Sequence, residues 1–357
     1  MHKNKDMDIK SLLQLTIEKN ASDLHMVVGI PPTLRIEDEL IPVPGEGILT
    51  AQIMDAIVKE VLNAGQLEIL ATNKELDLSL SFSEKARFRV NVYTQKGTWG
   101  IAFRKIPLII PRIDDLGLPK AIHQFSTMRQ GFVLITGPTG HGKSTTLASI
   151  INEINTNKSV HIVTIEDPVE FIFNPVKSII SQREMHEDTH SWSIALRSVL
   201  REDPNVVLIG EMRDYETIAA AITIAETGHL VFATLHTNSA AETIDRIVDV
   251  FPEEQQSQIR LQLSNVLASV VSQRLIPGIS GTRVVATECM MGSSAIKTAI
   301  REGKTHQIRS IIQTSADGGM YTLETSLANL VKENRITFDT ALSYSLEPDD
   351  LTRLVKS

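Results

Sequence analysis

Between residues 120 and 290, the hydrophobic positions form short continuous runs separated by helical patterns. The runs are GFVLITG (131–137), VHIVTIE (160–166), NVVLIGE (205–211) and HLVFATLHT (229–237). Each run is short, rich in β-branched residues and largely apolar, which is typical of strands covered on both faces. Strands that alternate with helices indicate a parallel sheet, so we expect an α/β core over 120–290.

The segment after the first run, STTLASIINEI, has the spacing of an amphipathic helix. Its apolar side chains recur at i, i+3, i+4 and i+7, at Leu147, Ile150, Ile151 and Ile154. This period places them on one face of a helix that packs against the sheet.

The C-terminal region, 291–357, is helical by the same criterion. One helical face there consists of Leu323, Leu327, Leu330 and Val331.

The N-terminal part of the chain mixes helical and strand patterns. SLLQLTIEKN (11–20) has helical spacing, and ARFRVNVYTQKGTWGIAFR (86–104) has the pattern of a β-hairpin with Gly97 in its turn. The following residues, 106–119, contain three prolines and little helical character. We therefore expect an α+β domain over 1–105 and a linker over 106–119.

The composition narrows the class of protein. With 42% hydrophobic and 22% charged residues, and no apolar run of about 18 residues, we expect a soluble globular chain. The N-terminus MHKNKDMDIK has no apolar segment typical of a secretory signal. The single cysteine, Cys289, excludes an internal disulfide and a four-cysteine zinc site, which favours a cytoplasmic location. A net charge of −8 argues against a general nucleic-acid binder.

The sequence G-P-T-G-H-G-K-S at 137–144 fits the phosphate-binding pattern G-x-x-x-x-G-K-[ST], with a predicted strand before it and a helix after it. Glycines let successive N–H groups face phosphate oxygens, and the helix adds its positive N-terminal end. We expect Lys143 to reach the β- and γ-phosphates of ATP and Ser144 to ligate Mg²⁺. His141 occupies a variable position of the motif and is expected to matter little. The candidate nucleotide-binding residues are Gly137, Pro138, Thr139, Gly140, His141, Gly142, Lys143, Ser144 and Thr145.

Two other predicted strands end in acids. Glu166 and Asp167 follow VHIVTI, and Glu211 follows VVLIG. Ligands gather at the carboxyl ends of parallel strands, so we expect these acids to approach the phosphates. One carboxylate is needed to hold Mg²⁺, and another to orient or deprotonate the attacking water. The pattern leaves open which acid has which role.

Basic side chains provide further candidates. His229 and His236 bracket the strand LVFATL. Each could sense the γ-phosphate or link the site to a neighbouring subunit, or could be a hydrogen-bonded structural histidine. The hairpin carries Arg87, Arg89 and Arg104. A guanidinium placed against the γ-phosphate promotes hydrolysis, but a solvated strand face with surface ion pairs explains the same residues.

In this order, four stretches resemble the boxes of the secretion and pilus ATPases, a branch of the RecA-like ring motors. GPTGHGKSTT is similar to their Walker A motif, TIEDPVEF to the Asp box, LIGEMRD to the atypical Walker B motif and GHLVFATLHTN to the His box. ASDLH and RFRVN near the N-terminus also match. The resemblance implies a PAS-like N-terminal domain, a RecA-like P-loop NTPase core and a hexamer in which each N-terminal domain packs on the next subunit.

The resemblance also implies roles. Glu211 is the Walker B acid, which serves as catalytic glutamate and, with Ser144, as Mg²⁺ ligand. Glu166 orients the metal or the water. The remaining implied catalytic residues are the His-box residues His229 and His236, and the arginines Arg89 and Arg104 near the γ-phosphate; Arg87 is less well matched.

The direction of work is indicated by AIKTAIREGKTHQI (295–308). It resembles the AIRNLIRE motif of the type IV pilus retraction ATPases, except that Lys297, Thr298 and Ala299 replace Arg-Asn-Leu. A packed helix without a special role is the alternative. Extension and type II secretion ATPases usually carry a paired CxxC zinc element and a longer N-terminal region. The sequence printed here has one cysteine and begins close to ASDLH, so we expect a retraction ATPase and not one of those.

The sequence thus predicts a Mg²⁺-dependent ATP hydrolase that retracts type IV pili in twitching motility. By the resemblance, we expect a homohexamer at the cytoplasmic face of the inner membrane. Its expected partners are a PilC-like platform protein and, optionally, a second retraction ATPase; we expect neither zinc nor nucleic acid. The alternatives are an accessory retraction motor, an extension or secretion ATPase, a RecA-like nucleic-acid motor, and a scaffold that binds ATP without turnover.

Overall fold

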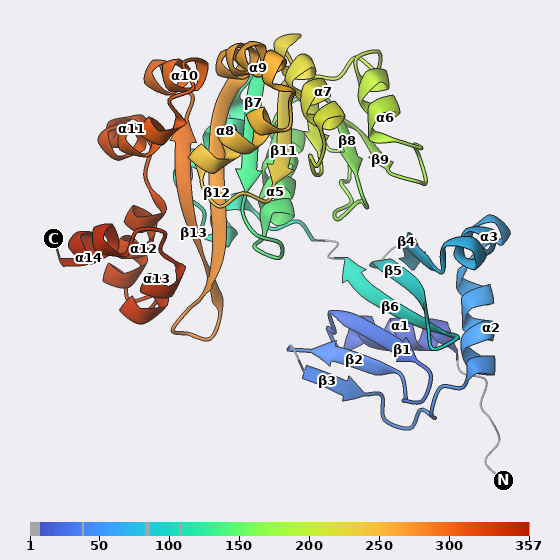
Figure 1. The fold of residues 1–357 in the computed structure, drawn as a ribbon. Coiled ribbons are helices and arrows are strands. Elements are labelled where there is room, and N and C mark those ends of the chain that lie inside the picture. Colours follow the sequence, from blue (N-terminus) through green and yellow to red (C-terminus); the bar gives the residue numbers. More distant parts are fainter. Residues whose placement is uncertain (1–7, 38, 83–85, 107–108, 357) are drawn as a thin grey trace. The chain divides into compact units, whose positions relative to one another are not determined.

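The computed structural model describes residues 8–37, 39–82, 86–106 and 109–356 (Figure 1). The charged N-terminus up to residue 7 lies outside the described residues. The contacts divide the chain into two compact units: Met1–Ile109 with Glu170–Ile172, and Ile110–Val169 with Phe173–Ser357. None of the described helices is long and apolar enough to cross a membrane. Each unit is described below by itself.

The first unit is an α+β domain around a six-stranded antiparallel sheet in the order β3-β2-β1-β6-β5-β4. Its strands are β1 (Asp23–Val27), β2 (Thr33–Ile36), β3 (Glu39–Pro42), β4 (Glu75–Phe82), β5 (Ala86–Gln95) and β6 (Thr98–Ile106). Its helices are α1 (Ile9–Glu18), α2 (Ala51–Val61) and α3 (Ala64–Asn73). The helix predicted over 11–20 is therefore present and begins two residues earlier.

The predicted hairpin is confirmed as β5 and β6, which pair antiparallel around Gly97. Gly97 has a positive φ of 74°, which glycine adopts at no steric cost. Alternate residues of β5, namely Phe88, Val90 and Val92, are fully buried. The polar residues between them lie on the other face of the strand. This alternation explains why the hairpin could be predicted from the sequence.

The second unit contains a seven-stranded sheet in the order β13-β12-β7-β11-β10-β8-β9. Its strands are β7 (Gly131–Thr136), β8 (His161–Glu166), β9 (Ile179–Glu184), β10 (Val206–Ile209), β11 (Leu230–Leu235), β12 (Leu267–Pro277) and β13 (Arg283–Met291). The four predicted strands, β7, β8, β10 and β11, are confirmed, and they pair in parallel. The sheet is mixed, because β13, which was not among the predicted strands, pairs antiparallel with β12. Polar residues such as Ser269, Ser272 and Gln273 break the apolar pattern of β12, although all three are buried.

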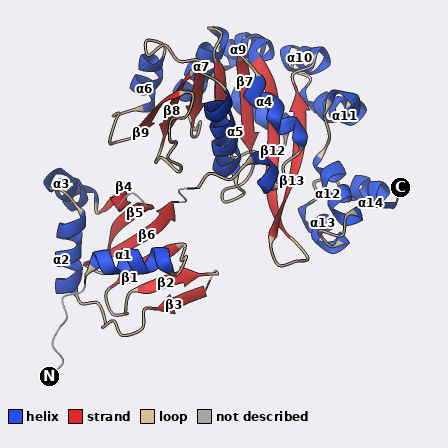
Figure 2. Cartoon of the chain, turned by 180° about the vertical axis from the view of Figure 1, so that it is seen from behind, coloured by secondary structure: helices blue, strands red, loops and turns tan. Residues whose placement is uncertain are grey.

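Helices cover both faces of this sheet. α4 and α5 lie on one face, and α7 and α8 on the other, as opposite views show (Figures 1 and 2). The predicted face of α5 is confirmed, since Leu147, Ile150, Ile151 and Ile154 are buried. The helices that pack around the sheet are α4 (His123–Thr127), α5 (Lys143–Asn157), α6 (Trp192–Val199), α7 (Tyr215–Glu226), α8 (Ala240–Asp249) and α9 (Glu253–Val266).

The C-terminal region is helical, as the pattern predicts. Its helices are α10 (Ser294–Arg301), α11 (Ile308–Thr314), α12 (Leu323–Lys332), α13 (Phe338–Tyr344) and α14 (Pro348–Lys356). On α12, Leu323, Leu327 and Leu330 are buried, and Val331 packs at the edge of the same cluster. The four short 3-10 helices of the second unit are Ile113–Leu116, Lys120–Ile122, Thr305–Gln307 and Ala316–Gly318. The first of them is a single short turn within the stretch predicted as the linker.

Candidate nucleotide-binding site

With the exception of His229, the predicted site residues of the second unit gather at one edge of its sheet. Strands β7, β8, β10 and β11 are parallel, so their carboxyl ends lie together. The phosphate-binding loop follows β7, Glu166 ends β8, Glu211 comes two residues after β10, and His236 directly follows β11. The topology therefore brings together residues that are far apart in the sequence.

The loop between β7 and α5 has the backbone that its glycines allow. Gly137, Gly140 and Gly142 have positive φ angles of 139°, 79° and 81°. At Gly137 a Cβ atom would lie 2.2 Å from the backbone oxygen of Gln273 on β12, so a side chain does not fit. Because α5 begins at Lys143, its N-terminal N–H groups face this loop. Together these features provide an anion-binding concavity for phosphates.

Lys143 folds back over the loop. Its Nζ donates hydrogen bonds to the carbonyl oxygens of Gly137, at 2.8 Å, and of Pro138, at 3.0 Å. The side chain is only 8% exposed. The two carbonyls satisfy hydrogen bonds of this buried ammonium and hold it at the loop. An ammonium at this place is suited to attract a triphosphate.

His236 connects the loop to the acid beyond β10. Its Nδ1 lies 3.2 Å from the hydroxyl of Thr139 and 3.4 Å from Nζ of Lys143. Its Nε2 lies 2.8 Å from Oε1 of Glu211. A carboxylate only accepts, so Nε2 donates to Glu211, while Nδ1 faces the hydroxyl of Thr139 and the ammonium of Lys143. The predicted link between His236 and the phosphate site is therefore present in the geometry.

Glu211 is held at both oxygens, because its Oε2 accepts a bond from the guanidinium of Arg213 at 2.9 Å. Burial raises the pKa of Glu211, but Arg213 and His236 outweigh burial and lower it below its usual range. Glu211 is thus a carboxylate at neutral pH and can accept a proton or bind a cation. Arg213 was missed by the sequence reasoning, although it stands two residues away in LIGEMRD.

Glu166 lies close to Glu211 at the same edge. Its side chain is 7% exposed, and its Oε1 accepts a hydrogen bond of 2.8 Å from Thr164. The intervening Gly210 packs on Glu166, since a Cβ at position 210 would lie 3.2 Å from the Cα of Glu166. Asp167, the next acid, adds negative charge near Arg213. Both acid-bearing strand ends are thus adjacent, as predicted.

The donor set at this edge suits a magnesium ion. The hydroxyl of Ser144 at the start of α5 and the carboxylates of Glu166 and Glu211 are oxygen donors. Mg²⁺ prefers such ligands and keeps several waters when it binds with substrate phosphates. The residues present therefore fit the implied ion.

His229 lies at the opposite edge of the sheet. It precedes β11, and its carbonyl accepts a bond from the N–H of Gly131, the first residue of β7. Its Nδ1 contacts the hydroxyl of Thr227 at 2.9 Å and the carbonyl of Ile224 at 3.0 Å. A strand of this length separates it from the loop by about 20 Å. His229 therefore lies away from the phosphate site of its own subunit, because parallel strands bring only their carboxyl ends to that site; the His-box role of His229 stays a prediction.

His141 has a specific contact that the sequence analysis did not predict. Its Nδ1 accepts a hydrogen bond of 3.0 Å from the backbone N–H of Leu275 on β12. Burial lowers the pKa of His141, and nearby Arg274 and Lys143 lower it further. The neutral ring is the form that can accept this bond.

The arginines of the first unit lie on adjacent strands. Arg89 and Arg104 are register partners on β5 and β6. The Nε of Arg104 bonds Oδ1 of Asp23 at 2.9 Å, and the Arg104 side chain is 70% exposed. Arg89 makes a longer ion pair of 3.9 Å with Asp77. Asp23, from the ASDLH stretch, is a further residue that sequence reasoning did not assign. Arg87 shares the same face of β5.

The stretch 295–308 begins with α10, which packs against α9. Ile296, Ala299 and Ile300 are buried in the main core of the second unit. Ala299, one of the divergent positions, is thus an inward residue, whereas Lys297 reaches the carbonyl of Asn265 at 3.4 Å. The packed-helix alternative accounts for the inward residues.

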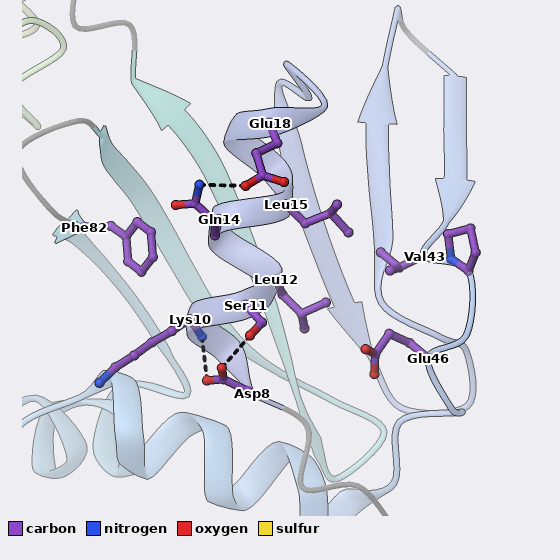
Figure 3. A pocket seen from close by; sticks show the side chains of 11 residues that line it. Asp8, Lys10, Ser11, Leu12, Gln14, Leu15, Glu18, Val43, Glu46 and Phe82 are labelled. Carbon is purple, nitrogen blue, oxygen red and sulfur yellow. Dashed lines mark hydrogen bonds between the residues drawn. The ribbon is translucent and has the colours of Figure 1, made fainter.

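A separate hollow of about 530 Å³ lies on α1 of the first unit (Figure 3). Leu12, Leu15 and Phe82 supply apolar side chains, and Glu18 and Glu46 lie at its rim. It contains none of the predicted catalytic or nucleotide-binding residues. The candidate site of the second unit therefore rests on the loop and strand ends and not on this cavity.

Comparisons with known proteins identify relatives of this chain. The family model described as "Type II/IV secretion system protein" matches residues 48–338. The chain is 45% identical over 344 residues to the Pseudomonas aeruginosa type IV pilus retraction ATPase PilT, covering 96% of this chain and all of the relative. It is 42% identical to a Neisseria gonorrhoeae twitching motility protein, covering 93% and 89%. A crystal structure of the pilus retraction motor PilT with bound ADP superposes with a TM-score of 0.92 at 42% identity, covering 97% and 99%.

Proposed function

We propose that this chain works as a Mg²⁺-dependent homohexamer. It belongs to the type II/IV secretion ATPase family and is a PilT-like pilus retraction ATPase. The observation that carries the proposal is the connection from the P-loop through His236 to Glu211. It joins the residues that bind phosphate to the residue that acts on the attacking water. The proposed site is therefore a hydrolytic one and more than a nucleotide clamp.

The chemistry follows from these contacts. The N–H groups of the loop and of α5 bind the phosphates, and Lys143 transfers its bonds from the Gly137 and Pro138 carbonyls to the β- and γ-phosphates. Glu211, kept ionised by Arg213, orients the water and accepts its proton. His236 holds Glu211 in place and reports on the γ-phosphate through Thr139 and Lys143. Ser144 and Glu211 would hold Mg²⁺, which would supply positive charge to the phosphate that is transferred.

Arg104 and Arg89 are proposed to approach the γ-phosphate, in cis or from a neighbouring subunit. Asp23 supports this role for Arg104, since it binds Nε and leaves most of the guanidinium exposed. Arg104→Gln should abolish most turnover with the fold intact, whereas Asp23→Asn should reduce turnover less, because the guanidinium remains. Unchanged kinetics in Arg104→Gln would make Arg104 a surface ion-pair residue. Circular dichroism of both variants checks the fold.

We further propose that closure and release of subunits around the ring withdraw pilin at the cytoplasmic face of the inner membrane, through a PilC-like platform protein. The retraction relatives support this direction. An accessory or extension motor would share the same site, so the direction needs a cellular test.

That test counts surface pili and measures surface motility in a strain whose only copy carries Glu211→Ala. Excess pili with lost motility is expected, because filaments would be made but not withdrawn. Bald cells would show that the site drives assembly. The matched control is Glu254→Ala, an exposed glutamate on α9, which should behave as wild type.

A further inference from the structure

β12 extends past the end of β7 and runs beside the P-loop. Ser272 on β12 pairs with Thr136, the last residue of β7. The next residues of β12 therefore lie along the loop that follows Thr136. The backbone oxygen of Gln273 occupies the space where a Cβ of Gly137 would be, at 2.2 Å. The loop is thus in close contact with this strand.

The side chain of Gln273 joins two parts of the phosphate site. Its Nε2 donates to the carbonyl oxygen of His141 in the loop at 2.8 Å. Its Oε1 accepts from the hydroxyl of Thr146 in the first turn of α5, also at 2.8 Å. The Gln273 side chain is only 3% exposed. One buried amide therefore fixes the loop relative to the helix N-terminus. The Leu275 N–H bond to His141 lies directly beside it.

We propose that Gln273 is a positioning residue for the nucleotide site, an inference that rests on the proposed ATPase function. Glycines make this loop conformationally permissive, so the N–H groups that face phosphate need support from outside the loop. Gln273 holds the loop in its binding shape before nucleotide arrives. A loop shaped in advance loses less conformational freedom on binding.

The bonds of Gln273 are present whether the phosphate is intact or being transferred. They therefore contribute equally to binding of the ground state and of the transition state. Loss of such an interaction raises KM and leaves kcat unchanged. A residue that only stabilises the core would lower thermal stability without changing nucleotide affinity.

The test uses Gln273→Met in the full chain, since methionine keeps the length of the side chain but not its amide. Binding of the fluorescent nucleotide mant-ADP with Mg²⁺ is measured by equilibrium titration. The Kd is expected to rise about 10-fold, with kcat for ATP within about twofold of wild type. Thr146→Val removes one bond and should raise the Kd about threefold. The control, Gln262→Met, alters a surface glutamine that bonds Glu226 and should bind as wild type.

An unchanged Kd in both variants, with a lower melting temperature, would overturn the proposal and assign Gln273 to the core. A fall in kcat at constant KM would overturn it as well. If Gln273→Met does not fold, Thr146→Val decides by itself. If the wild-type chain does not bind mant-ADP, the proposed function is refuted, and this inference with it. If the wild-type chain binds mant-ADP and the variant binds it equally well, only the role of Gln273 is refuted.

Discussion

The two ends of strand β11 carry one histidine each, and the two histidines have different surroundings. His236 follows the carboxyl end and contacts Thr139, Lys143 and Glu211. His229 precedes the amino end, and its ring Nδ1 contacts local groups of the preceding turn, Thr227 and Ile224. The difference shows that the direction of a strand, more than residue type, decides which histidine can take part in phosphate chemistry.

The two edges also differ in electrostatics. At the carboxyl edge, the carboxylate of Glu211 is shared between His236 and Arg213 beside a buried ammonium. Away from this edge, His123 at the start of α4 lies between Asp114 and Glu153, and Glu153 belongs to α5. Glu153 lies ten residues after the start of α5, about 15 Å along the helix toward the other edge. The charges there connect elements of the fold and do not converge on a phosphate loop.

The largest effect is expected from Glu211→Gln, which keeps shape and removes the charge that accepts a proton. Turnover should fall by about 100-fold to 10,000-fold, while mant-ADP binding stays within about threefold. A malachite-green phosphate assay and a binding titration check this pair of values. Glu254→Gln serves as control. Retained turnover would show that Glu211 is not a catalytic residue. The proposed difference between the two edges of the sheet would then be wrong.

The next effect separates the two histidines directly. His236→Asn should lower kcat about 10-fold to 100-fold, because Glu211 loses a charge-assisted bond. His229→Asn should stay within about threefold of wild type. Both variants are compared in the same steady-state assay. A large loss in His229→Asn would mean that His229 acts on a neighbouring subunit, because it cannot reach the phosphates of its own.

A smaller effect is expected from Arg213→Gln, and it is a shift with pH. Arg213 helps to lower the pKa of Glu211, so its removal lets that pKa rise. The acid limb of the kcat/KM profile should then move to higher pH, with the largest loss at acidic pH and less than about 10-fold loss at neutral pH. An unmoved acid limb would show that another group titrates in the profile.

The smallest effect is expected far from the site, at His123→Gln. Hydrogen bonding to Glu153 raises the pKa of His123, against burial, and Asp114 raises it further. The stabilisation is therefore complete below the usual histidine pKa of about 6.5 and is lost as pH rises through the folded value. The wild-type melting temperature should exceed that of the variant by about 2 °C at pH 6, and the difference should vanish at high pH. ATP turnover should not change.

Most of the fold could be predicted because its periodicities are strong. The four central strands are apolar on both faces, and α5 keeps its apolar residues on one side. Strand β12 escaped prediction because Ser272, Gln273 and Arg274 interrupt its apolar run. These residues are polar since the strand borders the phosphate loop. The apolar pattern therefore did not predict β12, because it is interrupted at the part of the strand that contacts the P-loop.

The site shows the same division. The P-loop is contained in one continuous segment, so Lys143 and Ser144 could be assigned from spacing alone. Glu166 and Glu211 could be assigned because acids at strand ends converge in a parallel sheet. Several roles of His229 stayed open, because the sequence does not state at which edge of the sheet a residue lies until the strand direction is known. Arg213 and Gln273 show their partners only in the folded chain.

By itself, the sequence determined the α/β class, the phosphate loop, the helical C-terminal region and the family resemblance, because each depends on neighbours within a short stretch of chain. Only the tertiary structure decided that His236 belongs with Glu211 and that His229 does not. The reason is geometric, since strand order and direction bring together residues that are separated by many positions. A side chain such as Gln273 takes its role from the loop that the fold places beside it.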